Sequence, residues 1–325
     1  MSMNTDNHKA VTVSNLRKQF GRFTAVDRIS FDVAEGEIFG FLGPNGAGKS
    51  TTIRMLCGIL APTSGSGTVA GFDVVTQQEK IKQHIGYMSQ KFSLYEDLTV
   101  EENIDFYSGI YKVHRDKKGA RKEWILKMAG LEAMRSNLTK TLPVGWKQRL
   151  ALGCAIIHEP KILFLDEPTS GVDPIMRNHF WELIRQMARD GVAVFVTTHY
   201  MDEAENCDRL ALIYKGTLIA MGTPYQLKTQ SMKGHCLQLS LPDPEGWITQ
   251  LNALPGVRQT ALFGSMLHCV VDDAESAKPV IEKLLKTNNL NDYAITRIEP
   301  SLEDVFVSLI ESYDKENTAD ESYAA

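Results

Sequence analysis

The segment Gly43 to Ser50 has the residue types and spacing of a loop that binds phosphate groups, G-x-x-x-x-G-K-[ST]. Glycines allow the backbone to wrap closely, so its N–H groups and the N-terminus of a following helix can face phosphate oxygens. In such a loop Lys49 reaches the β- and γ-phosphates of a nucleoside triphosphate, and the hydroxyl of Ser50 ligates Mg²⁺. The segment therefore predicts a site for a nucleoside triphosphate with its magnesium ion.

Two acidic residues, Asp166 and Glu167, directly follow the short apolar run Lys161 to Leu165. An acid at the carboxyl end of a parallel strand lies where α/β sheets bind their ligands. Asp166 is the candidate for the Mg²⁺ shell, and Glu167 is the candidate for orienting or deprotonating an attacking water. An acidic pair after a strand is by itself more typical of surface salt bridges. The phosphate loop in the same chain favours the catalytic interpretation.

These residues need elements that hold them at one edge of a sheet. Ile38 to Leu42 is an apolar strand that leads into the glycine-rich turn, and a helix is expected after the turn. Ala193 to Thr197 is a further short apolar strand, and it leads to His199. Strands alternate with helical patterns over residues 10–200, which predicts an α/β fold with a mainly parallel sheet.

The alternating pattern thins near Gln230, and strand-like and helical segments of a different arrangement follow from His235. We therefore expect a main domain over residues 10–231 and a small α+β accessory domain over 232–311. The polar residues 1–9 and the acidic residues 312–325 are expected to be disordered tails.

The composition excludes several classes of protein. Hydrophobic residues make up 43% and charged residues 23%, which is typical of a chain with a packed core. A net charge of −5 gives no general attraction to nucleic acid, so we expect no nucleic-acid partner. No apolar run reaches the roughly 18 residues of a membrane-spanning helix, and the polar start lacks the apolar core of a signal peptide. The five scattered cysteines predict reduced thiols, most of them in the core.

Over residues 10–230 the chain resembles the ATP-binding subunit of ABC transporters. GPNGAGKST (43–51) is similar to the Walker A motif of that family, and ILFLDEP (162–168) is similar to Walker B followed by the catalytic glutamate. TSGVDP (169–174) resembles the D-loop, and THYMDEAE (198–205) resembles the H-loop. The run DEPTSGVDP and a C-terminal appendage that ends in SLEDVF resemble the ABC-2-type exporter ATPases, which handle drugs, cell-envelope components or sodium.

The resemblance implies a P-loop NTPase fold of the ABC type. Such a fold has a mainly parallel sheet, an antiparallel β subdomain and a helical subdomain, the last over about residues 91–160. It implies an ATPase with ATP and Mg²⁺ as cofactors, which drives export through separate polytopic permease subunits of the ABC-2 type. It also implies a peripheral position on the cytoplasmic face of the inner membrane.

The resemblance further assigns roles to single residues. Phe20 would stack on adenine, although a core residue at a strand edge is the alternative, and Asp173 would organise the dimer face. Gln90 would touch Mg²⁺ and sense the permease, and His199 would hydrogen-bond the γ-phosphate, so that both join Glu167 as catalytic residues. The implied metal ligands are Ser50, Gln90 and Asp166. The implied phosphate-binding residues of the loop are Gly43, Pro44, Asn45, Gly46, Ala47, Gly48, Lys49, Ser50 and Thr51.

One motif departs from the family pattern. Where the family has the signature LSGGQ, this chain has Leu142-Pro143-Val144-Gly145-Trp146, in which only Gly145 of the central trio is retained as a γ-phosphate contact. Pro143 lacks a hydroxyl and a backbone donor, and Val144 cannot adopt the freer backbone angles of glycine. Each lost charge-assisted hydrogen bond costs on the order of 1.5–3 kcal/mol.

Two such ATPase domains sandwich two ATP molecules in the family, so a second ATPase domain is an implied partner. The altered signature leaves two arrangements open. One is a heterodimer in which the other chain supplies a normal signature, and the other is a homodimer with two altered sites.

Two other functions stay open beside export. One is a soluble non-transport ABC ATPase that acts on ribosomes or DNA, although tandem nucleotide domains, a long charged linker and zinc-binding cysteines are not found in the sequence. The other is a low-turnover regulatory ABC subunit, which the altered signature favours and the presence of Glu167 and His199 opposes. The cargo depends on the permease, so drug, lipid, polysaccharide and ion are equally compatible with the chain.

Overall fold

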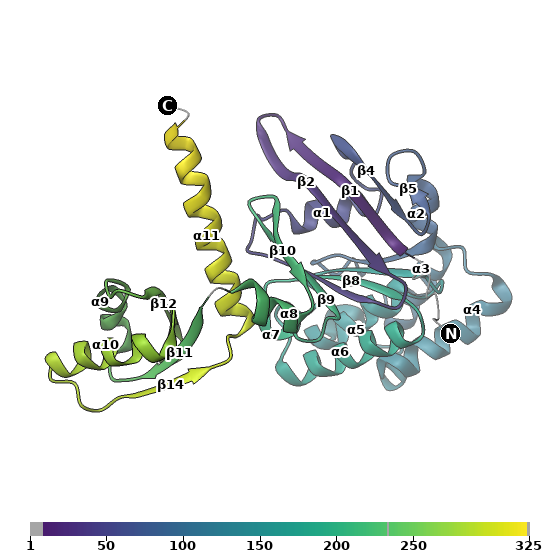
Figure 1. Ribbon diagram of the computed structural model, residues 1–325. Coiled ribbons are helices and arrows are strands. Elements are labelled where there is room, and N and C mark those ends of the chain that lie inside the picture. Colours follow the sequence, from purple (N-terminus) through teal and green to yellow (C-terminus); the bar gives the residue numbers. More distant parts are fainter. Residues whose placement is uncertain (1–8, 233, 324–325) are drawn as a thin grey trace, which may run out of the picture. The chain divides into compact units, whose positions relative to one another are not determined.

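The computed structural model describes residues 9–232 and 234–323, and it divides into two compact units between Met221 and Gly222 (Figure 1). The sequence analysis placed this boundary further along the chain, after residue 231. The division comes earlier because the short helical segments α8 (Pro224–Gln226) and η3 (Leu227–Ser231) belong with the second unit, where η3 contacts α11 (Leu302–Tyr323). Of the predicted N-terminal tail, residues 1–8 lie outside the described residues, and Lys9 already belongs to the first strand.

The first unit begins with a four-stranded antiparallel sheet in the order β2-β1-β4-β5. Apolar side chains alternate with polar ones along its two long strands, because one face packs on the core and the other faces solvent. This is the antiparallel β subdomain that the resemblance implied. Its strands are β1 (Lys9–Phe20), β2 (Phe23–Ala34), β4 (Ser64–Val69) and β5 (Phe72–Asp73).

A six-stranded sheet in the order β10-β9-β3-β8-β7-β6 forms the centre of the first unit, and the predicted parallel arrangement is confirmed for β9, β3, β8, β7 and β6. Strands β3, β7 and β8 are buried along their whole length. The strands are β3 (Ile38–Leu42), β6 (Ile85–Met88), β7 (Ile162–Asp166), β8 (Ala193–Thr198), β9 (Arg209–Tyr214) and β10 (Thr217–Gly222).

The register of the parallel sheet brings three strand ends to one edge. Leu42 of β3 lies beside Thr198 of β8, and Asp166 of β7 lies beside Thr197 of β8. Because parallel strands run in the same direction, the segments that follow β3, β7 and β8 all leave the sheet at the same edge. The phosphate loop, Glu167 and His199 therefore come together although they are far apart in the sequence.

Phenylalanines fill the space between the two sheets of the first unit. Phe31 of the antiparallel sheet stacks on Phe39 with ring centroids 5.4 Å apart, and Phe41 and Phe195 complete the group at 5.3–5.9 Å. Helices α1 (Lys49–Leu56), α2 (Gln78–His84), α6 (Pro174–Arg189) and α7 (Met201–Ala204) also belong to this unit. Along α6 the buried residues Phe180, Trp181, Ile184 and Met187 recur at helical spacing.

A helical region lies within the predicted range of about 91–160. Its helix α3 (Val100–Ile110) begins with a capping box in which Thr99 and Glu102 each satisfy the other's backbone N–H. Helices α4 (Arg115–Ala129) and α5 (Val144–Ala155) pack with α3 around a core of their own. Two short 3₁₀ turns, η1 (Glu132–Met134) and η2 (Thr139–Thr141), connect α4 to α5.

A half-buried histidine that follows α5 predicts a dependence of stability on pH. His158 stacks on Tyr111 with ring centroids 3.9 Å apart, and its Nε2 donates to the carbonyl of Ile85 at 3.0 Å. Burial lowers the pKa of His158 to about 4, whereas an unfolded histidine titrates near 6.5. Between these two values only the unfolded chain binds the proton, so acidification through this range favours unfolding.

We expect the wild type to lose about 2–3 kcal/mol of unfolding free energy between pH 7 and pH 4 that a His158→Gln variant does not lose. Glutamine keeps a donor for the carbonyl of Ile85 but does not titrate. Urea unfolding across this pH range measures the free energy of unfolding of both proteins. Subtracting one pH profile from the other removes the contribution of the carboxylates that titrate in both. Parallel pH profiles for the two proteins would show that the burial of His158 does not oppose its protonation.

The second unit contains a four-stranded antiparallel sheet in the order β12-β13-β11-β14. Its apolar face packs against α9 and α10 in a separate core, which agrees with the α+β fold expected for the C-terminal residues. The elements are β11 (His235–Ser240), η4 (Pro244–Trp247), α9 (Ile248–Asn252), β12 (Val257–Phe263), β13 (Met266–Val271), α10 (Ala274–Thr287) and β14 (Ala294–Ile298).

The expectation that residues 312–325 are disordered is wrong for most of that range, because α11 continues from Leu302 to Tyr323. The segment contains neither glycine nor proline, and Lys315 lies 4.0 Å from Glu311, an i,i+4 pair that supports a helix. The acidic composition alone was a poor guide here.

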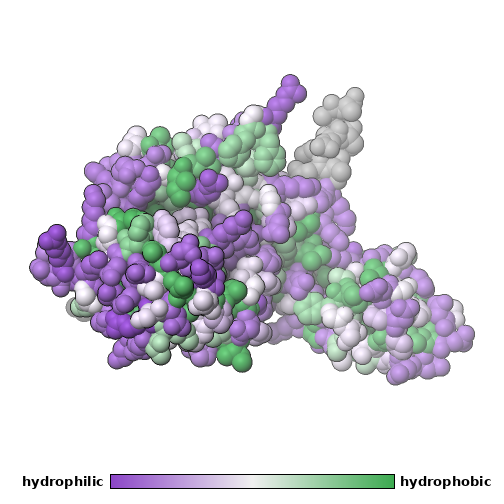
Figure 2. Space-filling model, turned by 180° about the vertical axis from the view of Figure 1, so that it is seen from behind, coloured by the Kyte–Doolittle hydropathy of each residue, from purple (hydrophilic) through white to green (hydrophobic). Residues whose placement is uncertain are grey.

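The surface and the thiols agree with the composition. Figure 2 shows a face on which hydrophilic residues predominate, with hydrophobic residues in small groups between them. Among the described helices, none has the length and apolar character needed to cross a membrane. All five cysteines are free and buried, as predicted.

Candidate functional site

The segment between β3 and α1 forms a tight turn that only glycine can make at two positions. Gly48 is the N-cap of α1 with φ 111°, and a Cβ there would lie 2.5 Å from the carbonyl oxygen of Ala25. A Cβ at Gly43 would lie 2.3 Å from the carbonyl oxygen of Ile213. Gly46, with φ 81°, has open space around it. The loop is therefore held against its neighbours at both ends while its tip stays exposed.

Lys49 opens α1 and points back into this loop. Its ammonium group donates to the carbonyls of Gly43 at 2.7 Å and Pro44 at 3.2 Å, and it lies 3.1 Å from a carboxylate oxygen of Glu167. Both side chains of this ion pair are buried, with 4% and 8% of their surface exposed. The pair joins the phosphate loop to the end of β7, two segments that the sequence analysis assigned to one site.

Asp166 and Ser50 meet at the same edge of the sheet. The Ser50 hydroxyl donates to Oδ1 of Asp166 at 3.1 Å, and the hydroxyl of Thr197 donates to the same oxygen at 2.7 Å. Two oxygen donors from different elements thus lie side by side at the first turn of α1. Oxygen ligands of this kind suit Mg²⁺, so the residues present fit the metal that the sequence implied.

Glu167 lies at the centre of the cluster because its backbone turns sharply after β7. Its φ of 47° is in the left-handed region, and its N–H donates to both the carbonyl and the hydroxyl of Thr197 at 3.1 and 3.0 Å. The second carboxylate oxygen accepts from Nε2 of Gln90 at 3.0 Å and lies 3.2 Å from Nδ1 of His199. Glu167 therefore contacts Lys49, Gln90 and His199 at once.

His199 follows β8 and is half-buried. Its Nδ1 approaches Glu167 without the alignment of a hydrogen bond and has no other hydrogen-bond partner among the described residues. The ring packs on Tyr200 with centroids 4.1 Å apart, and the guanidinium of Arg177 lies over Tyr200. A buried ring nitrogen that lacks a hydrogen bond is a group that a bound ligand could satisfy.

Three predicted site residues lie outside this cluster. Phe20 is at the end of β1, 47% exposed, with the ammonium of Lys18 5.1 Å from its ring centre. Gly145 is buried in the first turn of α5, where a Cβ would lie 3.1 Å from Met176. Asp173 caps α6 by accepting from the N–H groups of Ile175 and Met176. Of the remaining loop residues, Asn45 is exposed, Ala47 is buried, and Thr51 lies half-buried in α1.

The sequence analysis missed a buried network behind the site. Glu203 of α7 accepts hydrogen bonds from the hydroxyls of Thr169 and Thr198 and lies 3.2 Å from Nε of Arg177. Burial raises the pKa of the Glu203 carboxyl. The network joins the segment after Glu167 to the end of β8. The only sign of it in the sequence was a threonine close to each predicted site residue, Thr169 after Glu167 and Thr198 before His199.

A second missed contact joins α5 to the segment that follows β7. The amide of Gln148, fully buried in α5, donates to the carbonyl of Pro168 at 2.7 Å. Pro168 directly follows Glu167, so this hydrogen bond connects α5 to the segment that carries the carboxylate.

Comparisons with known proteins identify the family and the fold that this chain is similar to. A protein-family model described as ABC transporter matches residues 26–170. The probable multidrug ABC transporter ATP-binding protein YbhF of Escherichia coli is 53% identical over 227 residues, which are 70% of this chain and 39% of that protein. This chain thus spans about two fifths of the length of YbhF.

Two further proteins are matched over more of their own length. The linearmycin resistance ATP-binding protein LnrL of Bacillus subtilis is 35% identical, with 91% of this chain and 96% of that protein covered. The solved structure of cbiO1 from Clostridium perfringens, part of the ABC transporter complex cbiONQ, has a TM-score of 0.63 at 26% identity and covers 76% of this chain. The predicted ABC-type P-loop fold is confirmed, and the chain belongs to the ABC transporter family as one of its ATP-binding proteins.

Proposed function

We propose that this chain hydrolyses ATP and thereby drives export through separate membrane permease subunits of the ABC-2 type. The observation that carries the proposal is the position of Glu167, whose carboxylate contacts Lys49, Gln90 and His199 at the mouth of the phosphate loop. The family is that of an ABC ATPase, and a carboxylate held this way is suited to take a proton from an attacking water.

Each residue of the cluster has a proposed task. The loop N–H groups and the ammonium of Lys49 bind the phosphates, and the triphosphate competes with Glu167 and the loop carbonyls for that ammonium. Ser50 and Asp166 hold the magnesium ion, which supplies positive charge to the phosphates when it is bound. Gln90 orients Glu167, and His199 donates to the γ-phosphate.

Phe20, Gly145 and Asp173 have proposed tasks outside the cluster. The half-exposed ring of Phe20 is free to stack on adenine. Gly145 and Asp173 lie at the N-termini of α5 and α6, and we propose that they face the nucleotide and the D-loop of a second ATPase domain. The site is therefore complete only in a dimer, and ATP acts as the adhesive between the two domains.

The helical region offers a surface for the permease. Tyr95 packs edge-on against Phe106 with ring centroids 4.4 Å apart, and both rings are partly exposed beside Ile110 of α3. Exposed aromatic and aliphatic side chains of this kind suit a short helix of a membrane subunit. Docking there would place the chain peripherally on the cytoplasmic face of the membrane.

Recovery of the chain from membranes together with a polytopic protein, and the ATPase activity of the assembly recovered with it, test the proposal. Hydrolysis together with co-purification is the expected result. Hydrolysis without a membrane partner would instead support a soluble ABC ATPase, and co-purification without hydrolysis would support a regulatory subunit. The resistance and export terms in the names of relatives concern those proteins, and we propose a comparable export task here.

The altered signature gives a further prediction. Pro143 and Val144 are exposed at the start of α5, and Pro143 caps the helix without any side-chain hydrogen bond. We expect Pro143→Ser with Val144→Gly to raise the ATPase rate of the purified chain about tenfold or more, because a hydroxyl and a free backbone donor are each worth about 1.5–3 kcal/mol to a phosphate. The steady-state rate at saturating ATP measures the effect.

One control variant accompanies this double variant. Pro143→Ser alone improves the cap of α5, so thermal unfolding separates a gain in helix stability from a gain in turnover. An unchanged rate in the double variant would mean that the signature does not limit hydrolysis.

The same motif favours a heterodimer, in which another ATPase domain supplies a normal signature. A Glu167→Gln variant purified alone is then expected to stay monomeric with ATP and Mg²⁺, because the altered signature binds the partner's nucleotide weakly. Size-exclusion chromatography with light scattering measures the mass. A tight nucleotide-dependent homodimer would rule out the heterodimer.

A further inference from the structure

One face of the sheet in the second unit lies outside the apolar core of that unit. The face toward α10 carries Leu237, Leu239 and Leu267, as a hydrophobic core requires. On the opposite face lie Cys236 of β11 and His268 of β13. They share that face because Cys236 pairs with Val270, two residues along β13 from His268.

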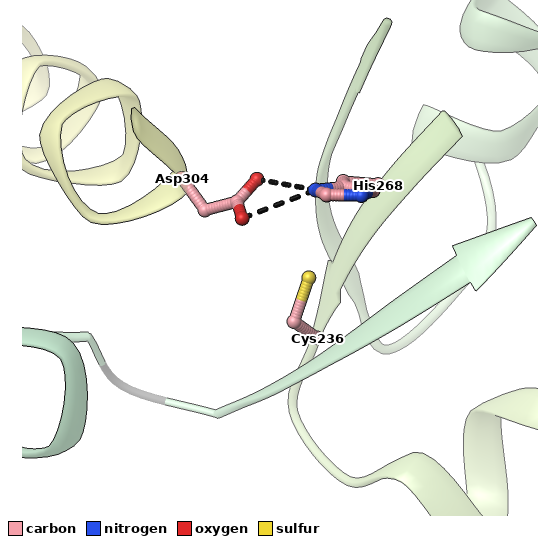
Figure 3. Close-up of side chains that lie close together, drawn as sticks. All are labelled: Cys236, His268 and Asp304. Atoms are coloured by element: carbon pink, nitrogen blue, oxygen red, sulfur yellow. Dashed lines mark hydrogen bonds and ion pairs between the residues drawn. The ribbon is translucent and has the colours of Figure 1, made fainter. Parts of the chain in front are cut away.

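The first turn of α11 adds a carboxylate to this face. Asp304 accepts from Nδ1 of His268 with both oxygens, at 2.9 and 3.1 Å, as Figure 3 shows. The thiol of Cys236 points toward the same space, and one ligand atom from each residue lies within 4.8 Å of the other two. We call these three residues, Cys236, His268 and Asp304, the buried Cys–His–Asp cluster.

Burial makes this grouping unusual. The relative exposures of Cys236, His268 and Asp304 are 1%, 5% and 6%. Asp304 has structural partners, since it also accepts from the N–H and the hydroxyl of Ser301, and Ser301 in turn caps α11 by accepting from the N–H of Asp304. The thiol has none: among the described residues, no hydrogen bond engages the sulfur of Cys236. A helix cap and an Asp–His hydrogen bond therefore account for two members of the cluster and leave the third unexplained.

We propose that the buried Cys–His–Asp cluster binds a divalent transition-metal ion of the zinc type. A thiolate, an imidazole nitrogen and a carboxylate oxygen are the ligand types that Zn²⁺ takes in proteins, whereas Mg²⁺ and Ca²⁺ prefer oxygen alone. Around one tetrahedral Zn²⁺ such atoms lie about 3.4–3.6 Å apart, given the usual bond lengths. The separations here, from 2.9 Å up to 4.8 Å, bracket that value, so small side-chain movements would complete the site.

The surroundings of the cluster hold the ligands in place. The ring of His268 stacks on Phe263 with centroids 4.3 Å apart and planes 8° from parallel. Ser301 fixes the carboxylate of Asp304 through two donors. Outer partners of this kind orient metal ligands and support binding. Three protein ligands leave one position of a tetrahedral ion for water.

The chemical step is a ligand exchange that needs no oxidant. The S–H bond of Cys236 breaks, the sulfur–metal bond forms, and that proton passes to the buffer. Nδ1 of His268 gives up its proton as Nε2 takes one, so the ring stays neutral, and the metal replaces the Asp304–His268 hydrogen bond. The ion would then join the N-terminal turn of α11 to β11 and β13. We expect it to stabilise the second unit, because binding to the folded state alone opposes unfolding. This inference does not depend on the proposed ATPase function.

Cobalt(II) is the probe for the experiment, because a cobalt–thiolate bond gives a charge-transfer absorption band in the near ultraviolet. The full chain is stripped with a chelator and titrated with Co²⁺ in the absence of nucleotide, so that the ATP site contributes no metal. We expect one Co²⁺ per chain with the thiolate band, displacement of Co²⁺ by one equivalent of Zn²⁺, and a rise in melting temperature on the order of 10 °C with excess Zn²⁺.

The matched variants are Cys236→Ser and Cys269→Ser. Both sulfurs are buried in the same sheet, but Cys269 belongs to the opposite face, in the core against α10. The band is expected to disappear in Cys236→Ser and to remain in Cys269→Ser. Absence of the band in the wild type, or its persistence in Cys236→Ser, would overturn the proposal and leave a simple Asp–His hydrogen bond. The wild-type titration is decisive even if a variant does not fold.

Discussion

Replacing Glu167 by glutamine is expected to lower the rate of ATP hydrolysis by about 10²- to 10⁴-fold while ATP binding is retained. Glutamine has nearly the same shape and can still contact Gln90 and His199, which touch one carboxylate oxygen in the wild type. It cannot take a proton from water, and it no longer neutralises Lys49. Nucleotide affinity should therefore stay the same or increase. Single-turnover hydrolysis and equilibrium ATP binding measure the two effects separately.

A glutamate outside the site provides the control. Glu159 is exposed and pairs with Arg121, so Glu159→Gln makes the same chemical change with no expected loss of hydrolysis. Wild-type turnover in Glu167→Gln would refute its role as the base. Loss of ATP binding along with turnover would show that Glu167 holds the loop in place instead.

Replacing Lys49 by alanine is expected to weaken ATP binding about 10- to 100-fold and to remove measurable hydrolysis. The ammonium supplies charge-assisted hydrogen bonds worth about 1.5–3 kcal/mol each, and 1.4 kcal/mol corresponds to a tenfold change in affinity. The substitution also leaves Glu167, which is 8% exposed, without its nearest cation. A fluorescent ATP analogue measures binding, and circular dichroism verifies the fold.

Lys161→Ala is the matched control for this variant. Lys161 is exposed and immediately precedes β7, at the end of that strand opposite to Asp166 and Glu167. We expect binding and turnover to be unchanged there. If Lys49→Ala bound ATP as tightly as the wild type, the phosphate site would have to lie elsewhere.

Much of the phosphate loop could be predicted because its chemistry is local. Glycines, a lysine and a serine within eight residues constrain the backbone between one strand and one helix, and the structure has β3 and α1 there. Asp166 and Glu167 were predicted for the same reason, since both directly follow an apolar strand.

Predictions based on composition were weaker. The acidic residues after 311 indicated disorder, yet α11 extends to Tyr323 because nothing in that segment interrupts a helix. The cysteines were correctly expected to be buried, but the sequence contained no sign that Cys236 lies beside His268 and Asp304. These residues are far apart in the chain, and strand pairing alone brings them together.

The sequence by itself determined the α/β class, the glycine-rich loop between β3 and α1 and the acidic residues at the end of β7, because each depends on neighbouring residues along the chain. Only the tertiary structure decided that Glu167 contacts Lys49, Gln90 and His199, and that Glu203 and Gln148 support the segment around it. The physical reason is that these contacts depend on the order β3-β8-β7-β6 in the sheet. Strand order follows from how the whole core packs, and no local pattern of residues encodes it.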